Sequence, residues 1–307
     1  AAWTAFFAPW NMGAAIFIWD HRERFDPQRT MRMLEDHPIS TFFAPPTAYR
    51  MLVQDELRKY SPKALRHCVA AGEAVNPEVI QSWKDGTGHH IWEGYGQTET
   101  VLLAATFPGM KYKPGSMGVT APGFHLAVVD EDGAELPVGT EGELAVRTYP
   151  ERPVGLFPGY LDDQEANARS FRSGWYYTGD LATQDEDGYF WFVSRADDLI
   201  ISASYRIGPF EVESALVEHP AVAEAAVVGK PDPLRGSIVK AFVLLRSGEQ
   251  ASRALATDIQ GHVKRVTAPY KYPREIEFVA DLPKTISGKI RRAELRLQEN
   301  DSEQSRE

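Results

Sequence analysis

Cysteine is nearly absent from the sequence, because Cys68 is the only one among 307 residues. A single thiol excludes an internal disulfide and a thiolate metal site, and it fits a reducing compartment. The N-terminal stretch lacks the charged region and the small-residue cleavage site of a signal peptide. Its apolar run is interrupted by Pro9, Asn11 and Gly13, which excludes a membrane span there. We therefore expect a cytoplasmic protein.

Basic charge is also in deficit, since 33 Lys and Arg residues face 43 Asp and Glu residues, a formal net charge of -10. The basic residues are dispersed rather than gathered into a stripe, which argues against nucleic acid as a partner. The sequence has no internal repeat and no low-complexity tract. With 43% hydrophobic residues, the composition is typical of a globular protein of about two domains. Small molecules are the expected ligands.

The apolar stretch at residues 3–19 predicts a strand or helix of a core. The sequence starts with Ala1 rather than Met, whereas natural domain ends are usually polar and frayed. We therefore expect a fragment, with apolar surface around this stretch that is prone to association.

Two kinds of pattern follow along the chain. Residues 25–120 alternate helical patterns with short apolar runs, including a capped helix from Phe25 and strands at 40–44 and 69–72, which predicts a largely parallel sheet. From 121 to 196, β-hairpin turns of the type Asp-Glu-Asp-Gly separate apolar runs, which predicts an antiparallel, barrel-like subdomain.

After Asp197 a small α+β domain is expected. Pro209 suits the first position of a helix. The other predicted elements are strands near 221–228, 239–245 and 275–279, a helix at 251–265 and a short basic helix at 290–298. The predicted fold class is thus α/β, with a mixed-sheet domain at 1–196, which includes the barrel-like part at 121–196, and a small mobile domain at 197–307.

The sharpest local motif is Gly94-Tyr-Gly-Gln-Thr-Glu99. Its glycines permit a tight turn, the hydroxyl of Thr98 can meet a phosphate, and the carboxylate of Glu99 can hold Mg²⁺. Taken alone, the same hexapeptide is also an ordinary turn between a strand and a helix.

Two further stretches carry groups suited to a nucleotide. Asp180 ends the aromatic run Trp175-Tyr-Tyr-Thr-Gly, where its carboxylate could accept hydrogen bonds from two ribose hydroxyls. Arg195 and Asp197 follow; alone, they would also suit a surface ion-pair cluster at a linker.

A lysine loop lies near the C-terminus, in Pro283-Lys-Thr-Ile-Ser-Gly-Lys289. Gly288 loosens the backbone, and Lys289 could neutralise charge that develops when a carboxylate attacks the α-phosphate of ATP. The neighbouring basic residues Lys284, Arg291 and Arg292 are expected to be solvated.

Together these stretches resemble the adenylate-forming superfamily, and within it the medium-chain acyl-CoA synthetases. The likeness is ordered and spans nearly the whole chain. It rests on these motifs: Phe6-Phe-Ala-Pro-Trp-Asn-Met-Gly, Phe43-Ala-Pro-Pro-Thr, Glu93-Gly-Tyr-Gly-Gln-Thr-Glu-Thr, Lys113-Pro-Gly-Ser-Met-Gly, Tyr205-Arg-Ile-Gly-Pro-Phe-Glu-Val-Glu and Thr267-Ala-Pro-Tyr-Lys-Tyr-Pro-Arg.

The resemblance implies ATP, CoA, Mg²⁺ and a medium-chain fatty or aromatic acid as ligands. It assigns catalysis to Lys289, Thr98 and Glu99, the metal to Glu99, and a hinge between half-reactions to Asp197. The implied ATP and AMP site comprises Gly72, Glu73, Ala74, Glu93, Gly94, Tyr95, Gly96, Gln97, Thr98, Asp180, Arg195 and Lys289. The implied CoA and substrate site comprises Ala203, Ser204, Tyr205, Arg206, Arg235 and Lys264.

The sequence departs from the family pattern at three points. It lacks the Ser/Thr/Gly-rich loop before Pro-Lys that grips the β- and γ-phosphates, so we expect that loop upstream of Ala1 and weak ATP binding without it. Ser204 occupies a glycine position, where a positive φ would be costly and the thiol passage narrower. Ser194, before Arg195, also replaces a glycine.

Three functions stay open. The first is an acid-thiol ligase that forms acyl-AMP and then acyl-CoA. The second is an amino-acid adenylation module, although no carrier domain follows the motifs in the sequence given. The third is a catalytically inactive nucleotide-binding remnant.

Overall fold

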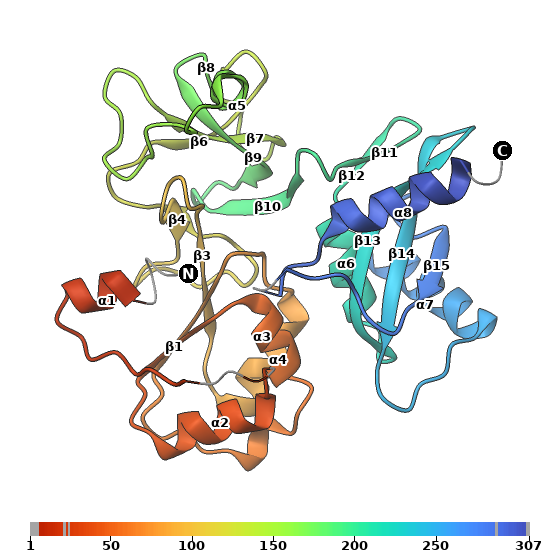
Figure 1. Cartoon of the computed structure of the whole chain (residues 1–307), viewed down its shortest axis with the longest axis horizontal. Coiled ribbons are helices and arrows are strands. Elements are labelled where there is room, and N and C mark those ends of the chain that lie inside the picture. The colour runs from red at the N-terminus through yellow and green to blue at the C-terminus, as the bar shows by residue number, and fades with distance from the viewer. Residues whose placement is uncertain (1–5, 21–22, 24, 286–287, 305–307) are drawn as a thin grey trace. The chain divides into compact units, whose positions relative to one another are not determined.

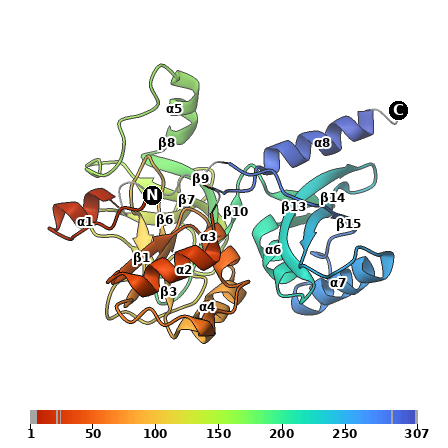
Figure 2. The ribbon, with the colours of Figure 1, turned by 60° about the horizontal axis from the view of Figure 1, so that its bottom comes forward.

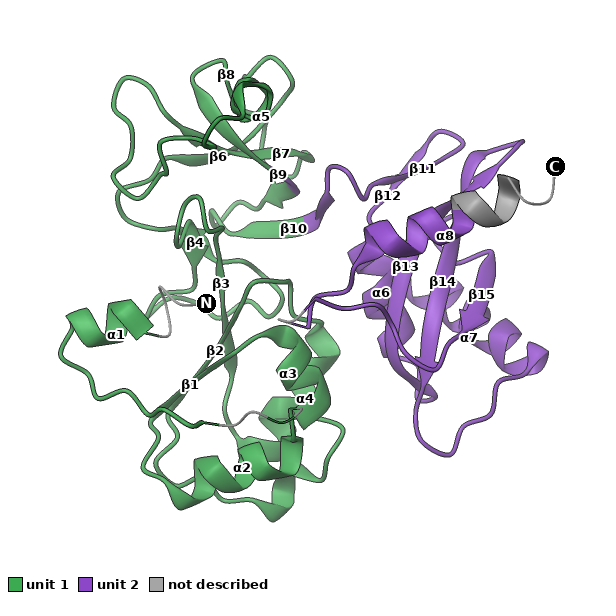
Figure 3. Cartoon of the chain, viewed as in Figure 1, with its two compact units in different colours: residues 1–178, 182–192 green, residues 179–181, 193–307 purple. Residues whose placement is uncertain are grey.

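A computed structural model gives the structure of the chain and describes residues 6–20, 23, 25–285 and 288–304. The chain divides into two compact units (Figure 3), one formed by residues 1–178 and 182–192 and the other by residues 179–181 and 193–307. Among the helices described, none is both long and apolar enough to cross a membrane.

The first unit contains a five-stranded sheet in the order β1-β2-β3-β4-β5. The first three strands are parallel, and the last two continue the sheet antiparallel. Because parallel strands end at the same edge of a sheet, the segments that follow β2 and β3 lie side by side. The strands are β1 (Thr41–Ala44), β2 (His67–Ala71), β3 (Ile91–Tyr95), β4 (Ala104–Ala105) and β5 (Val119–Thr120).

Helices cover one face of this sheet (Figures 1 and 2). They are α2 (Pro27–Asp36), α3 (Pro46–Leu52) and α4 (Pro77–Thr87), with a short 3-10 turn at Leu57–Lys59. Their apolar side chains form one core with β1, β2 and β3, around the fully buried Trp83. Asp26 caps α2 by accepting a hydrogen bond from the N–H of Arg29 at 3.1 Å, as the capped-helix prediction required.

The N-terminal apolar stretch does not form the predicted core element. Its described part contains only the four-residue helix α1 (Ala8–Asn11), which has no buried residue. The side chains of Trp10, Met12 and Ile18 are 63%, 82% and 76% exposed. The prediction rested on the apolar pattern of the sequence alone. Burial also requires a surface of the protein that packs against these side chains. Residues 3–5 lie outside the described part of the chain.

A second, antiparallel sheet has the order β10-β9-β7-β6, with β8 paired to β9, and it confirms the predicted hairpin region. Asp185 closes the turn between β9 and β10, because its Oδ1 accepts the N–H groups of Asp187 and Tyr189 at 3.0 Å. Both β9 and β10 contribute residues to both units. The elements are β6 (Leu126–Val129), β7 (Gly142–Arg147), α5 (Gln164–Ser170), β8 (Phe171–Arg172), β9 (Trp175–Gln184) and β10 (Phe190–Arg195).

The second unit is the expected α+β fold, with a three-stranded sheet between helices (Figure 2). Successive side chains of a strand point to opposite faces of the sheet, so neighbouring residues of β13 pack against different helices. Val227 packs with α6 and α7 on one face, whereas Ala226 packs with α8 on the other. Pro209 begins α6 as predicted. The elements are β11 (Ile200–Ser202), β12 (Tyr205–Ile207), α6 (Pro209–Val217), β13 (Val222–Asp232), β14 (Gly236–Leu245), α7 (Arg253–Val266), β15 (Glu275–Phe278) and α8 (Arg292–Gln304).

Candidate active site

The Gly94–Glu99 motif forms a tight turn at the end of β3. The carbonyl of Gln97 accepts the N–H groups of Thr100 and Val101 at 3.2 and 2.9 Å, and Thr100 Oγ1 accepts the N–H of Gln97 at 3.0 Å. A Cβ on Gly96 would lie 1.7 Å from the carbonyl oxygen of Val101. The turn therefore excludes any side chain at Gly96.

The side chain of Gln97 anchors this turn to strand β9. Its Nε2 donates to the carbonyl of Thr178 at 2.8 Å, and its Oε1 accepts the hydroxyl of Tyr176 at 2.9 Å. All three residues belong to the first unit. Both ends of the amide are thus hydrogen-bonded to strand β9. The predicted nucleotide contact of Gln97 stays a prediction.

Glu99 and Thr98 follow on the same turn. Glu99 Oε1 accepts the hydroxyl of Tyr160 at 3.2 Å, and the Glu99 carbonyl accepts the N–H of Phe157 at 2.7 Å. Thr98 is exposed. Within the described residues there is no cluster of three or more His, Cys, Asp or Glu side chains that could hold a metal. A lone carboxylate fits Mg²⁺, which commonly takes its remaining ligands from substrate phosphates and water.

The segment after β2 runs beside this turn. Gly72 has φ +105°, a conformation that favours glycine, and Glu73 pairs with Arg50 Nη2 of α3 at 3.1 Å. Glu93 Oε1 of β3 accepts the N–H of Val75 at 3.1 Å, which ties the ends of β2 and β3 together. Burial raises the pKa of the Glu93 carboxyl to about 8. Residues 72–74 are consequently held from both sides, by α3 and by β3.

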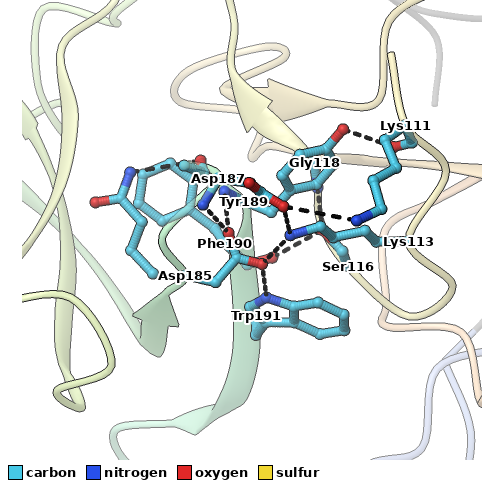
Figure 4. A network of polar contacts seen from close by, with 11 residues as sticks. Lys111, Lys113, Ser116, Gly118, Asp185, Asp187, Tyr189, Phe190 and Trp191 are labelled. Atoms are coloured by element: carbon cyan, nitrogen blue, oxygen red, sulfur yellow. Dashed lines mark hydrogen bonds and ion pairs between the residues drawn. The ribbon is translucent and has the colours of Figure 1, made fainter.

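A network of polar contacts surrounds Lys113 in the first unit (Figure 4). Lys113 Nζ lies 2.5 Å from Asp185 Oδ2 and 2.7 Å from Asp187 Oδ2, and Trp191 Nε1 donates to Asp185 at 3.0 Å. Burial alone would raise the pKa of Asp185, but the hydrogen bonds that it accepts lower it to about 2. The network therefore joins the Lys113 loop to the β9–β10 hairpin. Lys113 begins one of the motifs that carry the family resemblance, but no role was predicted for it.

Asp180 and Arg195 meet in the second unit. Arg195 Nη1 lies 3.2 Å from the buried Asp180 Oδ1, and Arg195 Nε lies 3.4 Å from Asp197 Oδ1. Gly179, at φ +73°, leaves space for this approach, because a Cβ there would lie 3.2 Å from Arg195 Nη2. The predicted pair of residues is thus brought together. Asp197 itself is exposed, and the substituted Ser194 is buried.

The predicted CoA residues Ala203 to Tyr205 form a hairpin turn between β11 and β12. Ser202 pairs with Tyr205, and the left-handed residue is Ala203, with φ +56°. The expected positive φ at Ser204 was therefore wrong, because this hairpin places its strained residue first, as type II′ turns do. The N–H of Ala203 donates to the carbonyl of Arg235 at 2.7 Å, which joins two predicted CoA residues through their backbones.

Two tyrosines that sequence reasoning had not assigned lie near this hairpin and α7. Tyr270 stacks on Tyr205 with ring centroids 4.1 Å apart, and Lys264 Nζ lies 3.8 Å from the ring centroid of Tyr272. Arg206 is exposed on β12. Both tyrosines belong to the Thr267 motif, so the signal was available in the sequence.

Lys289 is exposed and forms no hydrogen bond or ion pair through its side chain with any residue that the structure describes. Its backbone N–H donates to Thr285 Oγ1 at 3.1 Å, and its carbonyl accepts the N–H of Thr285 at 2.8 Å. Gly288 adopts φ +88°. Ile286 and Ser287 of the predicted motif lie outside the described residues.

The expectation that Lys284 and Arg292 are solvated was wrong. Lys284 Nζ lies 2.6 Å from Glu224 Oε2, and Arg292 Nη2 lies 2.6 Å from Glu213 Oε2. Both acids are buried. Only Arg291, whose side chain is 52% exposed, fits the solvated prediction.

Two family models match the chain. Residues 1–161 match the model described as AMP-binding enzyme, and residues 211–289 match the AMP-binding enzyme C-terminal domain. The first match covers more than half of the chain, so the chain belongs to the AMP-binding enzyme family. This confirms the predicted relationship to adenylate-forming enzymes.

Individual relatives narrow the comparison. The chain is 52% identical over 301 residues to mitochondrial acyl-coenzyme A synthetase ACSM3 of Mus musculus, and 52% identical over 301 residues to mitochondrial ACSM5 of Homo sapiens. Each alignment covers 97% of this chain and 52% of the relative. The chain therefore spans about half the length of the curated relatives that it matches.

Solved structures show the same fold. The anthranilate CoA ligase AuaEII in complex with anthranoyl-AMP superimposes with a TM-score of 0.88 at 34% identity, covering 96% of this chain and 56% of that one. A benzoate CoA ligase from Burkholderia xenovorans LB400 gives 0.82 at 32% identity, covering 94% and 57%. The predicted mixed α/β fold is confirmed.

Proposed function

We propose that this protein is an ATP-dependent acyl-CoA synthetase, which converts a carboxylic acid, ATP and CoA into acyl-CoA, AMP and diphosphate. The observation that carries the proposal is the turn after β3, where the close approach of Gly96 to Val101 presents an exposed Thr98 beside the single carboxylate of Glu99. The names of the 52% identical relatives, acyl-coenzyme A synthetases, support this reaction over others of the family.

In the first half-reaction, a carboxylate oxygen of the acid attacks the α-phosphorus of ATP, and the bond to diphosphate breaks. Lys289 is the proposed cation for the charge that develops on the phosphate. Thr98 would contact the phosphates, and Glu99 would hold Mg²⁺, which neutralises phosphate charge when it is bound. Residues 72–74 and Tyr95 are proposed to line the adenine.

Asp180 is the proposed ribose ligand, since a carboxylate can accept hydrogen bonds from both ribose hydroxyls. Arg195 supports this role, because its guanidinium at 3.2 Å favours the charged carboxylate that makes the stronger acceptor. Asp197, two residues later, is the proposed hinge.

In the second half-reaction, the CoA thiol attacks the acyl carbon and AMP leaves. The turn Ala203 to Tyr205 is the proposed pantetheine passage, and Arg235 and Lys264 are assigned to the CoA nucleotide. The hydrogen bond between the backbones of Ala203 and Arg235 supports a shared surface for these two. Arg206 is assigned to the acyl or phosphoryl group.

The proposed acid is a medium-chain fatty or an aromatic acid. Aromatic acids gain support from the anthranilate and benzoate ligases among the solved neighbours. A cytoplasmic location stays a prediction, and the relatives named mitochondrial make cell fractionation its test.

A panel of carboxylic acids tests the function on the full-length protein, with AMP and acyl-CoA as the measured products. We expect CoA-dependent AMP formation with one class of fatty or aromatic acid, and loss of AMP formation in Lys289→Ala. Turnover of amino acids alone would instead indicate an adenylation module. AMP binding without turnover of any acid would indicate an inactive nucleotide-binding remnant, and either result overturns the proposal.

A further inference from the structure

The loop that carries Lys289 is closed at its base by backbone hydrogen bonds. Lys284 and Ile290 form an antiparallel bridge, and the N–H of Arg291 donates to the carbonyl of Pro283 at 2.8 Å. Inside this base, Thr285 holds Lys289 twice, through its Oγ1 and through its N–H, at 3.1 and 2.8 Å. The backbone of Lys289 is therefore fixed to the base, while its side chain is exposed.

Two cations, Lys284 before the loop and Arg292 after it, form ion pairs that attach this base to the core of the second unit. Lys284 Nζ lies 2.6 Å from Glu224 Oε2 of β13. Arg292 grips Glu213 of α6 with two hydrogen bonds, Nε to Oε1 at 2.9 Å and Nη2 to Oε2 at 2.6 Å. The two acids are only 8% and 5% exposed. A two-point grip on a buried carboxylate fixes direction as well as distance.

The buried partner of Arg292 is itself held in place. Glu213 Oε1 accepts the N–H of Val227 at 2.9 Å, so the carboxylate is fixed between α6 and β13. Arg292 therefore ties the end of the lysine loop to two elements of the unit's core. Arg291, one residue earlier, has a 52% exposed side chain and offers a matched comparison.

The same arginine reaches the residue next to the proposed hinge. Arg292 Nη1 lies 3.6 Å from Asp198 Oδ2, and Arg296 Nη1 pairs with the other oxygen of Asp198. The side chain of Asp198 is 12% exposed. The start of α8 thus links the base of the lysine loop, the core and the residue after Asp197.

We propose that Lys284 and Arg292 are positioning residues for Lys289. Their ion pairs with the buried Glu224 and Glu213 fix the base of the lysine loop to the core of the second unit, so that Lys289 and Asp198 move together. The inference rests on the proposed function, in which Lys289 acts in adenylation. A positioning role for these two cations predicts that their loss slows adenylation alone. A residue that only stabilises the unit would affect both half-reactions alike.

The test measures the two half-reactions separately in the full-length protein. Adenylation is followed by acid-dependent exchange of diphosphate into ATP, and thioester formation by adding CoA to synthetic acyl-AMP. The variants are Arg292→Lys, Arg292→Gln and Lys284→Met. Because a misplacement of about 1 Å can cost on the order of 100-fold, we expect a loss of about 10- to 100-fold in the rate of exchange, with thioester formation unchanged.

Two controls separate positioning from stability. Arg291→Gln removes the adjacent exposed cation and is expected to leave both rates unchanged. Lys230→Met removes a cation that pairs with Glu275 and Glu299 of the same unit, which are not the acids that hold the base of the lysine loop. It is expected to lower the melting temperature without separating the two rates.

Thr285 keeps the test decisive if the arginine variants fail to fold, since it is exposed. Thr285→Ala removes the hydroxyl that Lys289 contacts and should slow exchange, whereas Thr285→Ser retains the hydroxyl and should restore it. Two results would overturn the positioning role and leave the proposed function intact. The first is an equal loss in both half-reactions. The second is normal exchange in the Lys284, Thr285 and Arg292 variants while Lys289→Ala abolishes exchange. Normal exchange in Lys289→Ala would instead overturn the role of Lys289 in the proposed function.

Discussion

Gly96 gives a sharp test of the turn on which the proposed site depends. A Cβ at this position would lie 1.7 Å from the carbonyl oxygen of Val101 and 2.7 Å from its carbonyl carbon. Both neighbours are backbone atoms, so no side-chain rotation relieves the overlap. In Gly96→Ala the turn must open by more than about 1 Å before the contact becomes tolerable in a close-packed interior.

Two other glycines provide matched controls. A Cβ on Gly94 would meet the side-chain end of Leu102 at 3.0 Å, which can rotate away, and a Cβ on Gly261 would meet Arg265 Nη1 at 3.4 Å. We expect Gly96→Ala to cost about 1–3 kcal/mol of unfolding free energy, and Gly94→Ala to cost less. Gly261→Ala should stabilise helix α7 by up to about 1 kcal/mol.

Urea unfolding of the 307-residue chain measures the stabilities of the three variants. Adenylation by the full-length protein measures the displacement of Thr98 and Glu99, for which a shift of about 1 Å predicts a loss on the order of 100-fold. The reasoning is refuted if Gly96→Ala unfolds at the same urea concentration as Gly261→Ala. Full adenylation activity in Gly96→Ala would refute it equally.

Burial raises the pKa of Glu93 to about 8 from an ordinary value of 4.5. The contribution of Glu93 to the free energy of unfolding is therefore full below pH 4.5 and is lost as pH rises through about 8. Urea titrations across that range should show a decline in stability on the order of a few kcal/mol, which Glu93→Gln should remove. The pKa of Asp185 is lowered to about 2, so its contribution to stability is present above pH 3.8 and is lost as pH falls through about 2. Asp185→Asn or Lys113→Met should therefore lower the melting temperature at neutral pH. Asp185→Asn should also reduce the loss of stability in acid. Ala203→Gly relieves a φ of +56° and should stabilise the chain by up to about 1 kcal/mol, whereas Ser204→Gly should not; urea unfolding that favours Ser204→Gly would contradict the turn assignment.

Local signals in the sequence predicted the elements well, because their causes are local. The cap at Asp26 and the proline at the start of α6 act within one helical turn. The glycine motif at residues 94–96 was likewise sufficient to predict a tight turn. What the motif did not show is that Tyr160 and Tyr176 hold this turn, since both lie at least 61 residues away along the chain.

The errors share one physical cause, which is that partners distant in sequence decide burial. Lys284 and Arg292 look solvated in a basic C-terminal stretch, yet their acids lie 60 and 79 residues earlier. The exposed Trp10 contradicts the predicted core element but agrees with the apolar surface that was also expected around this stretch, because an apolar pattern does not guarantee a covering surface. In the β11–β12 hairpin, the missing glycine was recognised, but the strand register decided that Ala203 rather than Ser204 takes the positive φ.

The central claim is that the protein activates an acid as its adenylate and transfers the acyl group to CoA. A single-turnover reaction of the full-length protein with ATP, Mg²⁺ and an acid that it accepts, followed by mass spectrometry, tests the claim directly. We predict that acyl-AMP accumulates before CoA is added, disappears as acyl-CoA forms, and is not made by Lys289→Ala. Acyl-CoA formation without any acyl-AMP, or acyl-AMP that CoA never consumes, would contradict the account.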